Sequence, residues 1–229
     1  MFNHVSHEFP KLLQENTDGT RYYVTPNGER YPSVTTILAD YKKKEILEWR
    51  ERVGEKTANR ISKAATTRGT SVHSVIEKYL NNEEIDMMSL MPNVKGLFVN
   101  MRKELDKMNN IHCLESKLHS HILKLAGTVD CIAEYDGVMS VIDFKTSKRL
   151  KRKEDIANYF MQGTAYSVMF EELTDQAFPI QQIVILIGVD GKDFAQVLKV
   201  KPMEYAPMLK EYILRYRETM ELRNETNTA

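Results

Sequence analysis

Residues 127–147 read GTVDCIAEYDGVMSVIDFKTS. Two apolar runs in this stretch flank Asp136-Gly137, a dipeptide that favours the two-residue turn of a β-hairpin. A hairpin closed by this turn pairs Tyr135 with Val138, and the same register then places Asp130 opposite Asp143. The stretch therefore predicts two antiparallel strands, over residues 124–135 and 138–145, with two carboxylates facing each other.

The facing carboxylates suggest a metal site. Side chains directly opposite on paired strands lie roughly 5 Å apart at Cβ, so Asp130 and Asp143 would repel each other unless a cation lay between them. Lys145 follows two residues after Asp143 and shares its face, whereas Phe144 points to the core. Two oxygen ligands beside an ammonium suit Mg²⁺ or Mn²⁺ and the activation of a water molecule. An Asp-x-Lys on a strand is more often a solvated surface, and the preceding apolar pair Val141-Ile142 argues against that alternative.

Composition limits the class of protein. The chain has 229 residues, of which 42% are hydrophobic and 28% charged, so it is expected to fold around a core. Two cysteines are too few for a disulfide framework, a four-cysteine zinc site or a four-cysteine iron–sulfur cluster. No apolar stretch approaches the roughly 20 residues that span a bilayer, so no membrane contact is expected. The net charge is zero and gives no hint of a nucleic-acid partner.

The rest of the chain alternates helical and extended patterns, which predicts an α/β fold. Residues 1–30 are expected to form an arm with at most a short hairpin, and residues 31–229 a single domain. Within it we expect a helical region over 33–110 and a core over 111–229 that includes the helix at 70–80. Further strands are expected at 111–118, 182–187 and 194–200. Further helices are expected at 34–38 after a Ser33 cap, at 43–65 with a break at Gly54, and at 94–108, 155–173 and 203–223.

The two aspartate strands resemble a known family. Gly127-Thr128-Val129-Asp130, followed by Ile142-Asp143-Phe144-Lys145, is similar to the core of the PD-(D/E)XK nucleases, in their RecB-like branch, and the likeness covers nearly all of the chain beyond residue 30. It implies a restriction-endonuclease-like core, with a small mixed β-sheet flanked by helices and an added N-terminal helical region. It also implies phosphodiester hydrolysis, with Asp130, Asp143 and Lys145 as catalytic residues.

Flanking segments extend the resemblance. Residues 68–73 resemble the helix that supplies a histidine ligand, which implies a metal held by His73, Asp130, Asp143 and the main-chain carbonyl of Phe144. Glu115 matches an acidic position of the first core strand and is a secondary candidate, with a surface glutamate as the alternative.

One helix carries a further match. Gln162 and Tyr166 reproduce the Gln-x3-Tyr pattern of the branch on one helix face, where contact with DNA phosphate or sugar is implied. Tyr159 shares that face and is a DNA-binding candidate. The alternative reading makes both tyrosines core aromatics.

A basic segment follows the second aspartate strand. Five of the six residues from 148 to 153 are basic, and phosphate-backbone binding is the natural interpretation, with a solvated loop as the alternative. The candidate DNA-binding residues are Lys148, Arg149, Lys151, Arg152 and Lys153. Lys42-Lys43-Lys44 is a weaker signal, and there the solvated reading is favoured.

These features lead to a functional expectation. The resemblance implies a DNA exonuclease that depends on Mg²⁺ or Mn²⁺ and acts in replication, repair or recombination. Single-stranded DNA cut from a free end is expected, since the helices between Lys43 and Leu80 could roof the site. An endonuclease or resolvase of the same fold, or a non-catalytic DNA-binding subunit of a recombination complex, are the alternatives. Replication or recombination proteins are possible partners, and the cytoplasm of a bacterium or phage-infected host is the expected location.

Overall fold

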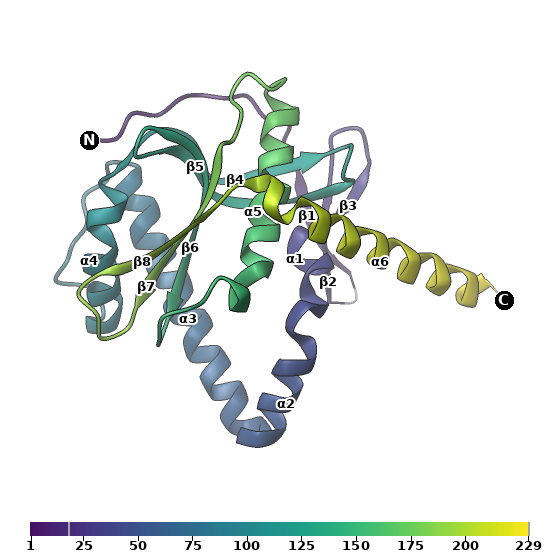
Figure 1. Ribbon diagram of the computed structural model, residues 1–229, viewed down its shortest axis with the longest axis horizontal. Coiled ribbons are helices and arrows are strands. Elements are labelled where there is room, and N and C mark those ends of the chain that lie inside the picture. The colour runs from purple at the N-terminus through teal and green to yellow at the C-terminus, as the bar shows by residue number, and fades with distance from the viewer. Residues whose placement is uncertain (18, 229) are drawn as a thin grey trace.

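A five-stranded mixed sheet forms the centre of the molecule (Figure 1). The computed structural model describes residues 1–17 and 19–228, with side chains to residue 222. The strand order is β4-β5-β6-β7-β8, and the bounds are β4 Met108–Ser120, β5 Leu125–Tyr135, β6 Val138–Ser147, β7 Gln182–Val189 and β8 Ala195–Val200. Only β6 and β7 run parallel, and every other neighbouring pair is antiparallel. The expected α/β fold with a small mixed sheet is confirmed.

The β5–β6 hairpin has the predicted turn and register. Asp136 and Gly137 both have positive φ, 52° and 75°, as a type I′ turn requires. The ladder runs from Tyr135↔Val138 to Cys131↔Ile142. It ends one pair before the two aspartates, so the expected direct pairing of Asp130 with Asp143 is wrong. The cause is local, because the Asp130 carboxylate accepts the Phe144 N–H at 2.9 Å.

Helices cover both faces of the sheet (Figure 1). Helices α3 (Glu55–Leu80) and α4 (Pro92–Leu105) pack on one face with Ile142 and Phe144, and α5 (Ala157–Leu173) packs on the other with Val141. Because side chains alternate along β6, Asp143 and Lys145 lie on the α5 face. The short 3₁₀ helix η2 (Glu154–Ile156) precedes α5, and α6 (Pro202–Thr228) closes the chain. Among the described residues, no helix is long and apolar enough to cross a membrane.

The N-terminal residues form more structure than an arm. Strands β1 (Leu13–Thr17), β2 (Thr20–Val24) and β3 (Arg30–Pro32) make a three-stranded antiparallel sheet. Two tyrosines hold it to the body: Tyr23 and Tyr31 are both buried, and the Tyr23 hydroxyl lies 3.2 Å from Thr128 Oγ1. The expectation of at most a short hairpin is wrong, because two buried aromatic rings supply the apolar contact that the polar composition obscured.

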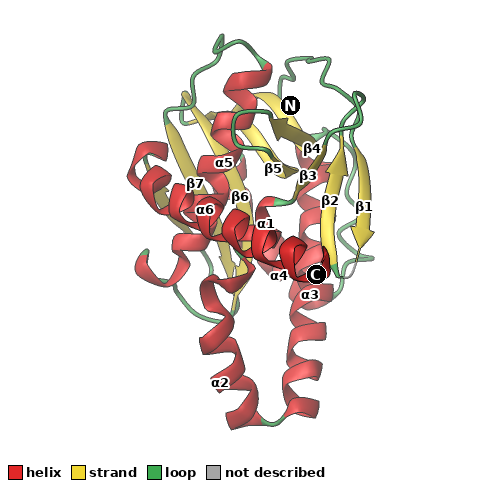
Figure 2. Cartoon of the chain, turned by 90° about the vertical axis from the view of Figure 1, so that its right-hand side faces the viewer, coloured by secondary structure: helices red, strands yellow, loops and turns green. Residues whose placement is uncertain are grey.

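The helices before the main sheet form a projection. Ser33 caps α1 (Val34–Ile37) as expected, and η1 (Ala39–Lys42) leads into α2 (Lys43–Val53). Gly54 separates α2 from α3 with φ +82°, so the predicted break is confirmed. The two helices leave the body as a hairpin (Figure 2), which we call the arch, residues 43–67. The expected gap between the helices at 43–65 and 70–80 is wrong: α3 continues through Gly69, whose missing Cβ lowers helix propensity without removing a backbone hydrogen bond.

Candidate metal site and active site

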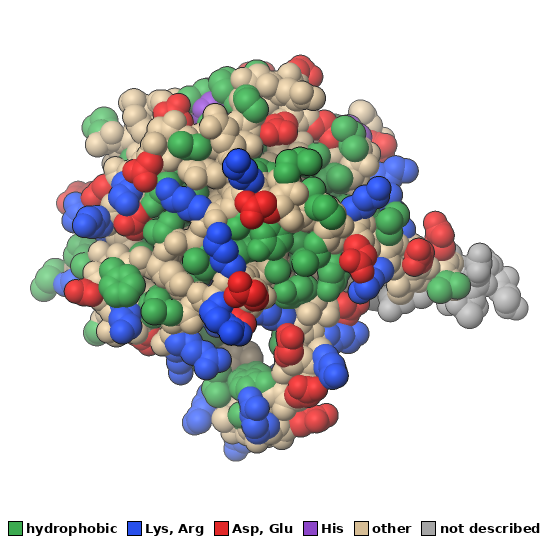
Figure 3. Space-filling model, viewed as in Figure 1, with side chains coloured by type: hydrophobic (Ala, Val, Ile, Leu, Met, Phe, Trp, Pro, Cys, Tyr) green, Lys and Arg blue, Asp and Glu red, His purple; other side chains and the backbone are tan. Residues whose placement is uncertain are grey.

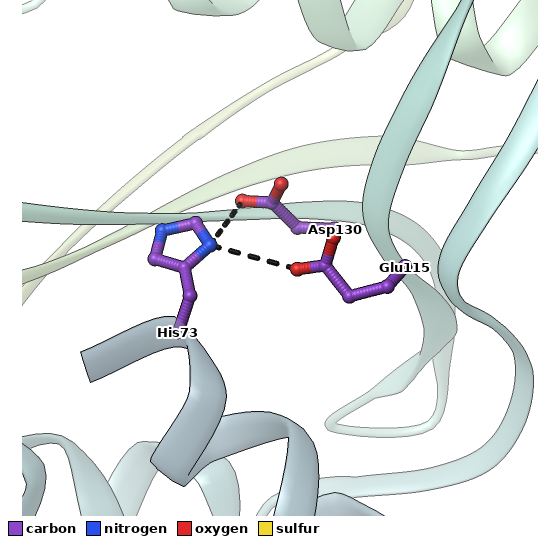
Figure 4. A group of neighbouring side chains, drawn as sticks. All are labelled: His73, Glu115 and Asp130. Atoms are coloured by element: carbon purple, nitrogen blue, oxygen red, sulfur yellow. Dashed lines mark ion pairs between the residues drawn. The ribbon is translucent and has the colours of Figure 1, made fainter. Parts of the chain in front are cut away.

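Three side chains that could hold a metal ion lie close together (Figure 4). His73 comes from α3, Glu115 from β4 and Asp130 from β5. His73 Nδ1 lies 3.6 Å from Glu115 Oε1 and 3.8 Å from Asp130 Oδ2. One ligand atom of each residue lies within 4.8 Å of the other two. Segments far apart in the sequence thus build one compact donor group.

A backbone hydrogen bond orients His73. Its Nε2–H donates to the Phe144 carbonyl at 2.7 Å, which turns Nδ1 toward the two carboxylates. Carboxylates only accept hydrogen bonds, so the three facing atoms require a proton or a metal ion among them. Burial acts to lower the pKa of His73, but the Glu115 and Asp130 carboxylates outweigh it and raise the pKa. The cluster therefore attracts a positive charge.

Glu115 occupies an unusual backbone position. Its neighbours pair as Leu114↔Cys131 and Ser116↔Val129, so Glu115 lies opposite Asp130. Its φ is +46°, a left-handed conformation that costs a residue other than glycine about 1–3 kcal/mol. The secondary candidate thus stands in the centre of the cluster. Sequence reasoning underrated it because nothing in the β4–β5 connection fixes the register as Asp136-Gly137 does for the hairpin.

Buried Asp143 and half-buried Lys145 form an ion pair beside the cluster. Lys145 Nζ donates to Asp143 Oδ1 at 2.5 Å, and Asp143 is 3% exposed. Burial raises the pKa of Asp143 to about 6 against the opposing pull of Lys145. Burial alone would lower the pKa of Lys145, but the Asp143 and Asp130 carboxylates raise it. The other oxygen, Asp143 Oδ2, is buried without a hydrogen-bond partner.

The residues present fit a divalent cation. Two carboxylates and one imidazole are ligands for hard to borderline ions such as Mg²⁺ or Mn²⁺. The unpartnered Asp143 Oδ2 is a fourth acceptor, and such an atom is costly unless a partner satisfies it. The Phe144 carbonyl accepts the His73 hydrogen bond, so its expected role as a ligand stays a prediction.

The α5 residues take different positions. The Lys145 ammonium lies 4.9 Å from the centre of the Tyr159 ring, a cation–π contact. Tyr166 is 3% exposed, which favours the core-aromatic alternative over contact with DNA. A Cβ at Gly127 would lie 2.7 Å from the Tyr166 hydroxyl, so glycine is needed for the helix to approach β5. Gln162 makes a side-chain hydrogen bond with Tyr166 and is partly buried.

The basic segment leaves β6 directly after this site. Lys148, Arg149, Arg152 and Lys153 are exposed and Lys151 is half-buried. Just before the arch, Lys42 Nζ donates to the carbonyl of Asp155, which follows the basic segment in η2. Figure 3 shows the molecule hollowed where the arch leaves the body, with Lys and Arg side chains around the hollow.

Comparisons with known proteins support the same reading. The sequence profile of the PD-(D/E)XK nuclease superfamily matches residues 94–224. Mitochondrial genome maintenance exonuclease 1 of Homo sapiens is 28% identical over 170 residues, which are 69% of this chain and 48% of the relative. The Mus musculus protein of that name is 28% identical over 168 residues, 69% of this chain and 49% of the relative.

The chain spans about half the length of these curated relatives. The matched profile covers more than half of the chain and includes β5, β6 and α5, which carry Asp130, Asp143, Lys145 and Gln162. The mixed sheet flanked by helices agrees with the restriction-endonuclease-like fold. The chain belongs to the PD-(D/E)XK nuclease superfamily.

Proposed function

We propose that this protein is a metal-dependent exonuclease that hydrolyses single-stranded DNA from a free end. The observation that carries the proposal is the placement of the His73–Glu115–Asp130 cluster beside the Asp143–Lys145 ion pair. The cluster supplies carboxylate oxygens and an imidazole nitrogen as possible metal ligands. The ion pair holds the Lys145 ammonium next to them. Family membership and the exonuclease names of the relatives support hydrolysis of a phosphodiester.

Each residue has a chemical task in this proposal. His73, Glu115, Asp130 and the free oxygen of Asp143 would hold Mg²⁺ or Mn²⁺. A divalent ion in such a site lowers the pKa of a bound water and offsets negative charge on the phosphate oxygens. Asp143 holds Lys145 in place through a hydrogen bond. The ammonium lies on the same face of the sheet as Asp143, where it orients the attacking water or neutralises charge on the phosphate. Tyr159 lies under Lys145 and limits its movement.

The path of the DNA follows from the surroundings of the site. Lys148, Arg149, Lys151, Arg152 and Lys153 would contact phosphates next to the scissile one. The arch stands over the hollow seen in Figure 3, so a strand that enters below it must be threaded from an end. A closed circle cannot be threaded, which is why we propose an exonuclease over an endonuclease.

The test compares linear and circular DNA of equal length. End-labelled single strands and closed single-stranded circles are incubated with Mg²⁺, Mn²⁺, Ca²⁺ or chelator. We expect linear strands to be degraded with Mg²⁺ or Mn²⁺, circles to resist, and Ca²⁺ to permit binding with little turnover. Circles cut as fast as linear strands would replace the exonuclease by the endonuclease or resolvase alternative. Binding without any hydrolysis would leave the non-catalytic DNA-binding subunit.

The biological setting stays a prediction. The relatives bear mitochondrial names, whereas the sequence led us to expect a bacterium or a phage-infected host. Replication and recombination proteins remain proposed partners, which purification of the protein together with its bound proteins from the source cell would identify.

A further inference from the structure

The basic loop, residues 148–153, is held by hydrogen bonds to neighbouring strands although its like charges repel each other. It has no helix or strand of its own, and five like charges on six residues repel each other. Gln196 on β8 bridges its backbone at Lys151: the Lys151 N–H donates to Gln196 Oε1 at 2.8 Å, and Gln196 Nε2 donates to the Lys151 carbonyl at 2.7 Å. One side-chain amide thus makes the two bonds that a neighbouring strand would make.

The sheet fixes Gln196 in turn. Its backbone pairs with Ile187 of β7, which runs parallel to the catalytic strand β6. The loop is also anchored near its start, where Ser147 Oγ–H donates to the Arg149 carbonyl at 2.7 Å. At its other end Lys153 Nζ donates to the Lys199 carbonyl of β8 at 2.7 Å. The loop is therefore fixed to β8 at two points and to the end of β6 at a third.

Four cations of the loop have no counter-ion among the described residues. Arg152 pairs with Asp155 at 3.0 Å, but no carboxylate lies at ion-pair distance from Lys148, Arg149, Lys151 or Lys153. Burial and the nearby Arg149 and Lys42 charges lower the pKa of Lys151, although Asp155 opposes them. Cations held close together on a fixed backbone form a site that an anion stabilises.

We propose that Gln196 is a positioning residue that orders the basic loop as a preformed cradle for DNA phosphates next to the scissile bond. The inference rests on the proposed function and deepens it. An unordered loop would lose backbone freedom on each binding event, at a cost in affinity, whereas the bridged loop has lost it during folding. The DNA then meets cations already in place.

Gln196→Met tests the proposal, because methionine keeps the length of the side chain and removes both hydrogen bonds. The matched control is Gln181→Met, an exposed glutamine before β7 whose side chain makes no hydrogen bond in the described structure. Hydrogen exchange reports the Lys151 amide, and fluorescence anisotropy in Ca²⁺ reports the Kd for a single-stranded oligonucleotide over a range of salt. Steady-state kinetics with Mg²⁺ separate KM from kcat.

We expect Gln196→Met to lose at least tenfold of the Lys151 amide protection and to raise Kd and KM about tenfold, with kcat within about twofold of wild type. The slope of log Kd against log salt should decrease by about one, because fewer phosphates are neutralised. Gln181→Met should match wild type throughout. Wild type that binds but never cuts DNA would refute the proposed hydrolysis, while the anisotropy series still decides the role of Gln196.

Two results would overturn the inference. One is a Lys151 amide that exchanges without protection in the wild-type protein. This measurement needs no variant, so it tests the ordering of the loop even if Gln196→Met does not fold. The other is a Gln196→Met protein whose loop exchanges freely while its Kd and salt slope equal those of wild type.

Discussion

The two halves of α3 contrast sharply although they form one continuous helix. From residue 55 to residue 67 the only buried side chain is Ala58, and residues 59–67 are all exposed. From residue 68 to residue 80 the helix buries Val72, Val75, Ile76 and Leu80 against the sheet and presents His73 to the site. The same backbone is thus a part of the core at one end and a free-standing arm at the other.

The difference shows what holds the arch in place. Between residues 55 and 67, helix α3 buries only Ala58, so packing against the core contributes little to its stability. Isolated helices of this length are marginal in water. The packed half supplies the nucleus from which the helix continues. Arg50 of α2 adds a cross-link at the tip, where its guanidinium donates to Asn59 Oδ1 at 2.6 Å. The arch is therefore rigid at its base and exposed along its length.

The largest expected effect is the loss of nuclease activity when Asp143 or Lys145, next to the packed half of α3, is replaced. Asp143→Ala or Lys145→Ala should lower kcat/KM at least about 10³-fold, or about 4 kcal/mol, because each removes a group that holds or offsets charge in the transition state. Kd for DNA should change little. The exposed Asp193→Ala is the control, and activity within about tenfold of wild type in either site variant would exclude a direct role.

The next effect separates the two halves by stability. Ile76→Ala in the packed half should lower the free energy of unfolding by about 2–5 kcal/mol, because it leaves a cavity in the core. Ile61→Ala in the arch should change it by less than about 0.5 kcal/mol, since that side chain is exposed. Urea unfolding measures both. Equal losses would mean that the arch packs on the body in solution.

A smaller effect distinguishes two glycines. Gly127→Ala should cost about 1–3 kcal/mol by forcing the new Cβ against the Tyr166 hydroxyl, and Tyr166→Phe should recover part of it. Gly54→Ala at the arch tip meets no atom within 4 Å, so its cost of about 1–3 kcal/mol comes from the backbone alone, at φ 82° and ψ 145°, where residues with a Cβ are rare. Thermal unfolding of the three variants and the double variant checks this. Because the Tyr166 ring carbon Cε1 would still lie 2.8 Å from the new Cβ, only partial recovery is expected, and a Gly127→Ala protein as stable as wild type would argue against the clash.

The smallest effect concerns pH. The N-terminal segment is fastened to the packed end of α3, where His4 Nε2–H donates to the Leu80 carbonyl at 2.9 Å, and to β4, where His7 Nε2 lies 2.8 Å from His112 Nδ1. Burial lowers the pKa of His7 and of His112, and their mutual repulsion adds to the effect at His112.

The unfolded chain therefore binds protons more readily than the folded chain as pH falls below about 6.5. The stability that neutral His7 and His112 contribute is therefore complete above that pH and is lost progressively below it. Hydrogen exchange at pH 7.5 and 5.5 should show the first residues loosening while the arch is unchanged. A His7→Gln/His112→Gln protein should lose this pH dependence, and an unchanged profile would assign it to other groups.

Sequence reasoning reached the elements whose signals are local. Asp136-Gly137 fixes a hairpin register, Ser33 and Gly54 mark helix ends, and aliphatic spacing identifies the packed half of α3. It failed where the deciding contact is distant. The Asp130 carboxylate takes the Phe144 N–H and ends the ladder, which no propensity reveals. Glu115 and Gln196 are placed by strand pairings made across the sheet. The buried rings of Tyr23 and Tyr31 anchor a sheet that composition alone suggested was an arm.

The parallel pairing of β6 with β7 sets the order in which the candidate site is enclosed during synthesis. β6 ends at Ser147 and its partner begins at Gln182, so the strand that carries Asp143 stays at an open sheet edge while α5 is still being synthesised. Tyr159 of α5, which packs on Lys145, and the neighbouring strand β7 both emerge from the ribosome after Asp143 and Lys145. A chain released before residue 182 thus lacks the strand that pairs with β6 beside Asp143 and Lys145.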